Sequence, residues 1–256
     1  MRQHLRELAG ATIMTGKLLL RGMIAGVVGG LLAFLFARLY GEPLIDVAIA
    51  FEEHAGAAHD AAEPEMVSRA TQAGLGLLTG VVVYGAALGG ILALAFAVVY
   101  GRFSRLGVRA LAAIMALSGF VAVILVPVVK YPANPPAVGA ADTIGDRTQL
   151  FFIMLLVSLA LMIAAFALAR RMRPRLGAWN AAIVAGLAYV LAIAVVMALL
   201  PEVNEVPDGF SAVLLWRFRL AALGLQAVIW ATVGLLFGFL AERLVLGAPS
   251  KPDRRV

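Results

Sequence analysis

Six long apolar stretches, separated by shorter polar segments, dominate the order of hydrophobic and polar positions along the chain. An α-helix needs about 20 mainly apolar residues to cross the hydrocarbon core of a bilayer, and each stretch reaches that length. The pattern therefore predicts an all-α fold, a polytopic transmembrane helix bundle of six spans that forms a single membrane domain over residues 1–256. The spans are placed near Leu20–Leu39, Ala73–Tyr100, Val108–Val129, Leu150–Ala169, Ala178–Leu200 and Phe218–Leu240.

The composition supports this interpretation. Hydrophobic residues make up 62% of the 256 residues, and charged residues only 14%. A soluble domain typically carries about 25% charged residues, and a core of this size cannot bury the excess apolar surface, so lipid must cover it. The chain has no cysteine, which excludes thiolate metal sites, iron–sulfur clusters and disulfides.

The charged residues are distributed unevenly between the two predicted faces of the membrane. Of the 21 Lys and Arg residues, 15 lie in the N-terminal segment, the loops near Arg105 and Arg173, and the C-terminal tail, whereas 12 of the 15 acids lie on the other side. The positive-inside rule then places both termini in the cytoplasm. The net charge of +6 therefore reflects topology, and it does not indicate nucleic-acid binding.

Glycines recur at four-residue spacing inside the predicted spans. The sets are Gly22, Gly26 and Gly30; Gly76 and Gly80; Gly85 and Gly89; and Gly234 and Gly238. Small residues four apart let helix backbones approach closely in lipid, so the spacing predicts helix packing. A substrate path through a glycine-lined gap is the less favoured alternative.

The longest polar segment between spans, Tyr40–Gln72, contains the first candidate site. Its part Pro43–Asp60 has apolar residues at helical spacing, which predicts an amphipathic helix lying on the membrane surface or over the bundle. The same segment offers a cluster of nitrogen and oxygen ligands of the kind that suits cobalt, nickel or zinc. The candidate ligands are Glu52, Glu53, His54, His59 and Asp60. The alternative is a solvated acidic loop.

The other two outer segments supply candidates for a pathway or gate. Lys130 lies where an apolar span meets the stiff turn Pro132–Pro136, either as a gate or as an anchor at the interface. Arg217 and Arg219 enter the sixth span against the positive-inside rule, and such charges usually pair with acids, for which Asp208, Glu205 and Glu202 are near in sequence. Glu42 and Asp46 are further partners, and Gln226 is the main polar side chain deeper in that span.

Three segments give the chain a resemblance to the CbtA family of predicted cobalt transporter membrane subunits. They are EPLIDVAIAFEEH after the first span, VVKYPANPPAVG after the third, and LLWRFRLAALGLQAVIWATVGLLFGF in the sixth. The resemblance implies a bacterial inner-membrane protein that imports Co²⁺ for cobalamin supply. It also implies a small partner, CbtB, with one transmembrane helix and a histidine-containing segment. Family members often carry more histidines in the first loop than the two found here, His54 and His59. The metal could therefore be captured by this chain or by its partner, and both alternatives stay open.

Two other classes of function stay open at this stage. The runner-up is a non-transporting membrane scaffold for another complex, which glycine-rich helices with few buried polar groups also suit. A membrane enzyme using Lys130, Asp146 and Arg147 is the least favoured, because the sequence offers no ordered nucleophile–base pair. We therefore expect no enzyme activity and no permanently bound cofactor, with Co²⁺ as cargo.

Overall fold

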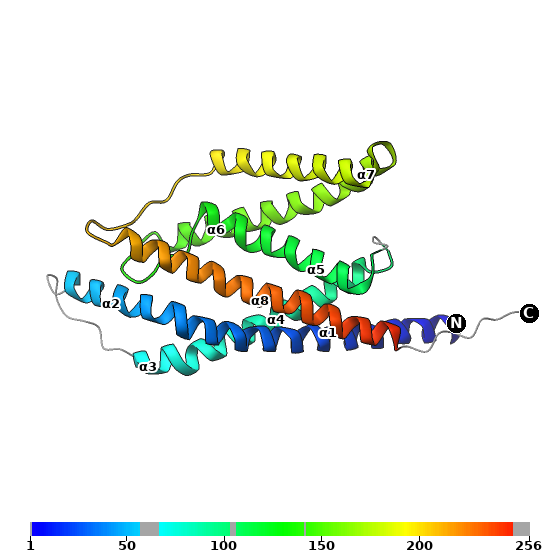
Figure 1. The fold of residues 1–256 in the computed structure, drawn as a ribbon, viewed down its shortest axis with the longest axis horizontal. Coiled ribbons are helices and arrows are strands. Elements are labelled where there is room, and N and C mark those ends of the chain that lie inside the picture. The colour runs from blue at the N-terminus through cyan, green and yellow to red at the C-terminus, as the bar shows by residue number, and fades with distance from the viewer. Residues whose placement is uncertain (1, 57–66, 103–105, 141, 248–256) are drawn as a thin grey trace, which may run out of the picture. The chain divides into compact units, whose positions relative to one another are not determined.

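The computed structural model describes residues 2–56, 67–102, 106–140 and 142–247, with side chains omitted for residues 2–12, 55 and 56. The described residues form helices joined by turns and loops, and they contain no β-strand, which confirms the all-α prediction. The elements (Figure 1) are α1 Arg2–Phe36, the π-helical turn η1 Ala37–Gly41, α2 Glu42–Gly56, α3 Arg69–Thr71, η2 Gln72–Gly76, α4 Leu77–Val99, α5 Val108–Gly119, η3 Phe120–Leu125, α6 Val126–Lys130, α7 Ile144–Leu199 and α8 Ala212–Leu246.

Five continuous helical stretches are long and apolar enough to cross a membrane within the described ranges. They are Ile13–His54, Arg69–Val99, Val108–Lys130, Ile144–Leu199 and Ala212–Leu246. Most positions of each apolar window are not buried in the isolated chain, as expected for helices that lipid surrounds. The chain is therefore a multi-pass membrane protein by length and composition of its helices.

The helix α7 contains two of the six predicted spans. Its 56 residues are interrupted at Gly177, whose backbone angles (φ 75°, ψ 169°) are not helical, and glycine adopts positive φ without steric cost. The two arms run side by side (Figure 1), and the hydroxyls of Ser158 and Tyr189 are hydrogen-bonded between them at 2.8 Å. A sharp turn at one residue thus separates the segments that the hydrophobic pattern placed at Leu150–Ala169 and Ala178–Leu200.

The first span and the predicted amphipathic helix are one continuous helical stretch, Ile13–His54. The prediction of a helix after Pro43 is confirmed through Gly56, but that helix continues from the span. The π-helical turn Ala37–Gly41 lies directly before Glu42 and Pro43. Proline has no N–H to donate, and a π-helical turn changes the hydrogen-bonding register there, so the helix passes this residue without ending.

The chain divides into two compact units. The first unit comprises Met1–Phe36, Glu65–Leu117 and Ala227–Val256. In it the α1 glycines Gly22, Gly26 and Gly30 face Gly89, Gly85 and Val81 of α4, so closely that a Cβ atom at any of the three would overlap the opposite backbone. Farther along the unit, Gly234 and Gly238 of α8 face Ala116 and Ala112 of α5.

These contacts confirm that the four-residue glycine spacing serves helix packing. The exception is the pair Gly76 and Gly80, because a Cβ at Gly80 would meet nothing within 4 Å. The α1–α4 seam is closed by backbone atoms, so the described part of this unit has no glycine-lined gap along it.

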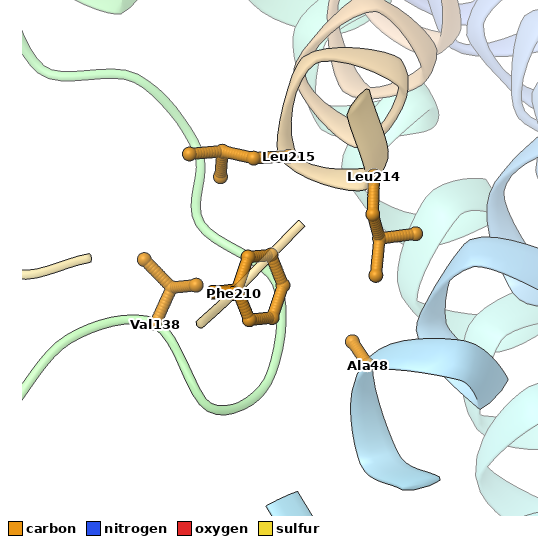
Figure 2. Close-up of a cluster of buried hydrophobic side chains, with 5 residues drawn as sticks. All are labelled: Ala48, Val138, Phe210, Leu214 and Leu215. Carbon is orange, nitrogen blue, oxygen red and sulfur yellow. The ribbon is translucent and has the colours of Figure 1, made fainter. Parts of the chain in front are cut away.

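The second unit comprises Ala37–Pro64 and Ser118–Gln226. One of its hydrophobic clusters joins α2, the loop before α7 and the beginning of α8, through Ala48, Val138, Phe210, Leu214 and Leu215 (Figure 2). Phe51 of α2 packs edge-on against Phe210, with ring centroids 5.1 Å apart. These contacts pack α2 against the loop before α7 and the start of α8, which are two of the segments that form the site described next.

Candidate functional site

The predicted metal cluster lies at the end of α2, and the structure describes only part of it. Glu52, Glu53 and His54 are exposed, whereas His59 and Asp60 lie outside the described residues. Across the described ranges, no group of three His, Asp or Glu side chains is close enough to hold a metal ion. The metal cluster as a whole therefore stays a prediction.

His54 is nevertheless oriented in a way that suits a metal ligand. Its Nδ1 lies 2.5 Å from the backbone oxygen of Ala50, one turn earlier in α2. A histidine that donates Nδ1–H to a carbonyl presents the lone pair of Nε2 outward, and ligating histidines commonly have this arrangement. The ring is exposed, so Nε2 is accessible from solvent.

The other predicted pathway residues differ in their exposure. Glu42 is buried at the start of α2, and Asp46, one turn later, is exposed. Asp208 and Arg217 are exposed, and Gln226 is half-buried in α8. Sequence proximity suggests one mouth built from these side chains, and that mouth stays a prediction.

A cavity of about 360 Å³ lies within the second unit. Its walls come from the Pro-rich turn, the first two turns of α7, the segment after α7 and the second turn of α8. The lining residues are Tyr131, Pro132, Asn134, Val138, Ile144, Arg147, Thr148, Phe151, Val203, Asn204, Glu205, Val206 and Arg219. Of the predicted pathway residues, Arg219 alone lines it.

Glu205 is the acidic residue among those that line the cavity. Its Oε2 accepts a hydrogen bond from the backbone N–H of Ala140 at 2.8 Å and lies 3.3 Å from Arg147 Nε in an ion pair. Arg147 also donates from Nη2 to the oxygen of Ala140 at 2.9 Å. The pKa of Glu205 is lowered by the Thr143 hydroxyl, the Ala140 N–H and the Arg147 charge, which outweigh desolvation. Glu205 is therefore ionised at neutral pH and neutralises Arg147.

Tyr131 and Lys130 form the end of α6. The Tyr131 hydroxyl donates to the oxygen of Pro201 at 2.9 Å, which ties the Pro-rich turn to the end of α7, and burial raises the pKa of Tyr131. Lys130 is half-buried, with Nζ 5.9 Å from the centroid of the Tyr131 ring. This position is typical of an interfacial anchor, the alternative that the sequence leaves open.

Arg219 has a different partner from the one expected. Its Nη2 donates to Asn134 Oδ1 at 3.1 Å, and its Nε is buried without a hydrogen-bond partner. In the described ranges no carboxylate pairs with it, although the sequence predicts an acid. The nearest acid in the cavity, Glu205, already accepts from Ala140 and faces Arg147. Arg147 and Glu205 together are neutral, so the cavity carries one uncompensated positive charge.

A family model described as "Probable cobalt transporter subunit (CbtA)" matches residues 15–242. The chain belongs to this family. The match includes the first four membrane-capable helices from Thr15 onward, α8 as far as Glu242, the Pro-rich turn and every residue of the cavity. The comparisons with curated proteins and with solved structures find no match. The resemblance inferred from the three segments is confirmed, and the CbtA protein is a subunit of a cobalt transporter.

Membership in the CbtA family also bears on the other expectations. A transporter subunit acts with other subunits and with a transported cation, and the family description concerns transport. The helices agree with a multi-pass membrane protein.

The Asn134–Arg219 contact is the feature that sequence reasoning missed, because the two residues are 85 positions apart. Its one signal in the sequence is a polar Asn among three prolines.

Proposed function

We propose that this CbtA protein is the membrane-embedded subunit that carries Co²⁺ across the bacterial inner membrane into the cytoplasm, for cobalamin supply. The observation that carries the proposal is the family match over residues 15–242, together with the long apolar helices inside it. The break at Gly177 supports six crossings, because it splits α7 into two arms. An even number of crossings and the concentration of basic residues support both termini in the cytoplasm.

In this proposal, the end of α2 collects the cation at the outer face. Glu52, Glu53 and His54, with His59 and Asp60, supply carboxylate and imidazole ligands. The acidic outer segments raise the local cation concentration. A small CbtB-like subunit with one transmembrane helix completes the transporter and shares the capture step. The protein holds no permanent cofactor, and Co²⁺ is cargo.

Beyond the mouth, the ion passes between helices and loses water to carbonyls and carboxylates. Glu42, Asp46 and Asp208 stand near the outer ends of the helices, and Lys130 and Arg217 repel the ion from the lipid boundary. Gln226, half-buried in α8, is the polar side chain available deeper in the span. Because acids are scarce inside the spans, the partner subunit supplies further ligands at mid-bilayer.

Uptake of radiolabelled Co²⁺ into vesicles tests the proposal. Vesicles contain the purified chain, the chain with its candidate small partner, or no protein. Saturable uptake that unlabelled cobalt competes away supports transport. No uptake in either protein sample, with the chain shown to be folded, would favour a non-transporting scaffold. That alternative has one observation in its favour, the closed packing of α1 against α4.

Substitution of His54 and His59 by Ala tests the capture step. Removing the hydrogen-bond partner of a metal ligand lowers metal affinity about 10- to 100-fold, and removing the ligand itself should lower the affinity at least as much. We expect half-maximal uptake at a correspondingly higher cobalt concentration, with the maximal rate retained. His4→Ala is the matched control, since it removes an imidazole on the predicted cytoplasmic side. Equal concentration dependence in all three proteins would remove His54 and His59 from the site.

A further inference from the structure

The cavity of the second unit has a charge that the protein itself does not balance. Arg147 is neutralised by Glu205, at 3.3 Å. Arg219 has one polar partner, the uncharged Asn134 Oδ1, and its Nε is buried without an acceptor. Buried polar nitrogens are normally paired, and a charged one incurs a larger free-energy cost when it is not. Arg147 Nε is likewise buried without a hydrogen bond, but Arg147 has the Glu205 charge beside it and Arg219 has no carboxylate. Because Arg219 Nε is enclosed by protein, an acceptor from outside the chain would contact the Nη end of the guanidinium, and the uncompensated charge favours an anionic one.

The remaining donors around Arg219 suit a group with several oxygens. Asn134 accepts through Oδ1, so its amide nitrogen is left to donate, and the Thr148 hydroxyl lines the same cavity. These donors come from different segments and do not lie in the single fork that a planar carboxylate matches. A tetrahedral phosphate accepts hydrogen bonds from several directions at once, and arginine is the residue most often used to bind it.

The cavity lies where the phosphates of a bilayer would be. Its walls are formed at the end of α6, the start and end of α7 and the second turn of α8, all at the ends of membrane-capable helices. Arg219 is about 10 Å along α8 from its first residue, at 1.5 Å per residue. Ile144 and Phe151 give the cavity apolar walls beside these polar groups. A ligand with an anionic head and an apolar portion meets both kinds of surface.

We propose that this cavity binds a phosphate group at Arg219, carried either by the headgroup of an anionic phospholipid or by a soluble phosphate ester. The phosphate oxygens accept from the Nη end of the Arg219 guanidinium and from the Asn134 amide, and the apolar portion of the ligand contacts Ile144 and Phe151. The proposal does not rest on cobalt transport, because it needs only the charge and the donors of this cavity.

Lipid titration of the purified full chain, read by native mass spectrometry, tests the proposal. The probes are phosphatidylglycerol, zwitterionic phosphatidylcholine and the soluble ester glycerol 3-phosphate. The test variant is Arg219→Gln, which retains a donor for Asn134 and removes the charge. The matched control is Arg217→Gln, which makes the same change in net charge at an exposed position two residues away. Size-exclusion profiles and helical circular dichroism show that each variant is folded.

We expect wild type and Arg217→Gln to bind phosphatidylglycerol in preference to phosphatidylcholine. Arg219→Gln should bind it about 10- to 100-fold more weakly, the usual effect of losing a charge-assisted hydrogen bond. Specific binding of glycerol 3-phosphate without lipid preference would support the soluble source. Equal binding of all probes by wild type and Arg219→Gln would overturn the proposal, as would equal losses in both variants.

A second variant gives a result of opposite sign. Glu205→Gln removes the carboxylate that balances Arg147 and retains an oxygen to accept from Ala140 N–H. The net charge of the cavity rises by one, so phosphate binding should tighten severalfold. A variant that merely disturbed the fold would bind less, and weaker phosphate binding by folded Glu205→Gln would contradict the electrostatic argument. The Glu205→Gln variant also keeps the proposal testable if Arg219→Gln does not fold.

Discussion

The seam between α1 and α4 is testable by adding a single methyl group at Gly30. A Cβ at this position would lie 2.6 Å from the oxygen of Val81 and 2.6 Å from the Cα of Val82. Ordinary van der Waals contact begins at 3.4 Å. Because both neighbours are backbone atoms, no side chain can move aside, and Gly30→Ala must push the helices apart by roughly 0.8 Å, the difference between the two distances.

The free-energy cost of that separation comes from weaker packing between the two helices on either side of Gly30. A gap of 0.5–1 Å removes about a quarter to a half of the dispersion attraction of each atom pair along the seam, and overpacking a core typically costs about 1–3 kcal/mol. Replacement of Gly by Ala in a helix returns at most about 1 kcal/mol through backbone entropy. Subtracting this return leaves a net destabilisation of up to about 2 kcal/mol for Gly30→Ala.

Gly80→Ala is the matched control, because it makes the same chemical change in α4, next to Val81, where a Cβ meets nothing within 4 Å. Reversible unfolding of the detergent-solubilised chain by a denaturing detergent measures all three proteins. Gly80→Ala should unfold at the wild-type midpoint or slightly above it, and Gly30→Ala clearly below. Indistinguishable midpoints for the two variants would refute the close approach of α1 and α4.

Two further predictions concern the second unit. Tyr189→Phe leaves the buried Ser158 hydroxyl without its 2.8 Å partner, so it should lower the free energy of unfolding by about 1–3 kcal/mol. Adding Ser158→Ala to this variant should restore part of the lost stability. If the two substitutions instead lowered stability by the simple sum of their separate effects, the pairing would be contradicted. The lowered pKa of Glu205 adds stability that is complete above its unfolded pKa of about 4.3 and disappears as pH falls through the folded value. Thermal melts from pH 7 downward should therefore show a stability advantage over Glu205→Gln that shrinks once the pH falls below the unfolded pKa, and an advantage that stayed constant into acid would disprove this account.

Periodicity and spacing predicted the features that depend on local chain properties. Apolar length alone predicts a membrane helix, because lipid replaces a core as the apolar environment. The four-residue spacing of Gly22, Gly26 and Gly30 predicts a packing seam, because those positions share one helix face. Neither inference needs a knowledge of the neighbouring helix. The turn at Gly177 was also accessible, since the arginine-rich segment before it marks a break between spans.

The cavity could not be predicted in this way, because its contacts join residues far apart in the chain. Glu205 binds the backbone at Ala140, 65 positions earlier, and Arg219 binds Asn134, 85 positions earlier. Sequence proximity assigned Glu205 to Arg217 and Arg219. Its Oε2, however, already accepts a hydrogen bond from the Ala140 N–H and faces the Arg147 guanidinium, so it has little hydrogen-bonding capacity left for another arginine. Electrostatic pairing in a folded chain follows tertiary position, which the local pattern does not encode.

The charge of this cavity also constrains the route of the transported ion. Two unit charges 4 Å apart interact by about 4 kcal/mol at an effective dielectric constant of 20, so a bare divalent cation beside Arg219 would be repelled by roughly twice that. Glu205 offsets little of it, because its carboxylate already faces Arg147. Without the proposed phosphate at Arg219, a cobalt path through this chain would have to bypass that residue, and the closed α1–α4 seam leaves no room for it there. The proposed partner helix is the element best suited to supply the missing wall of that path.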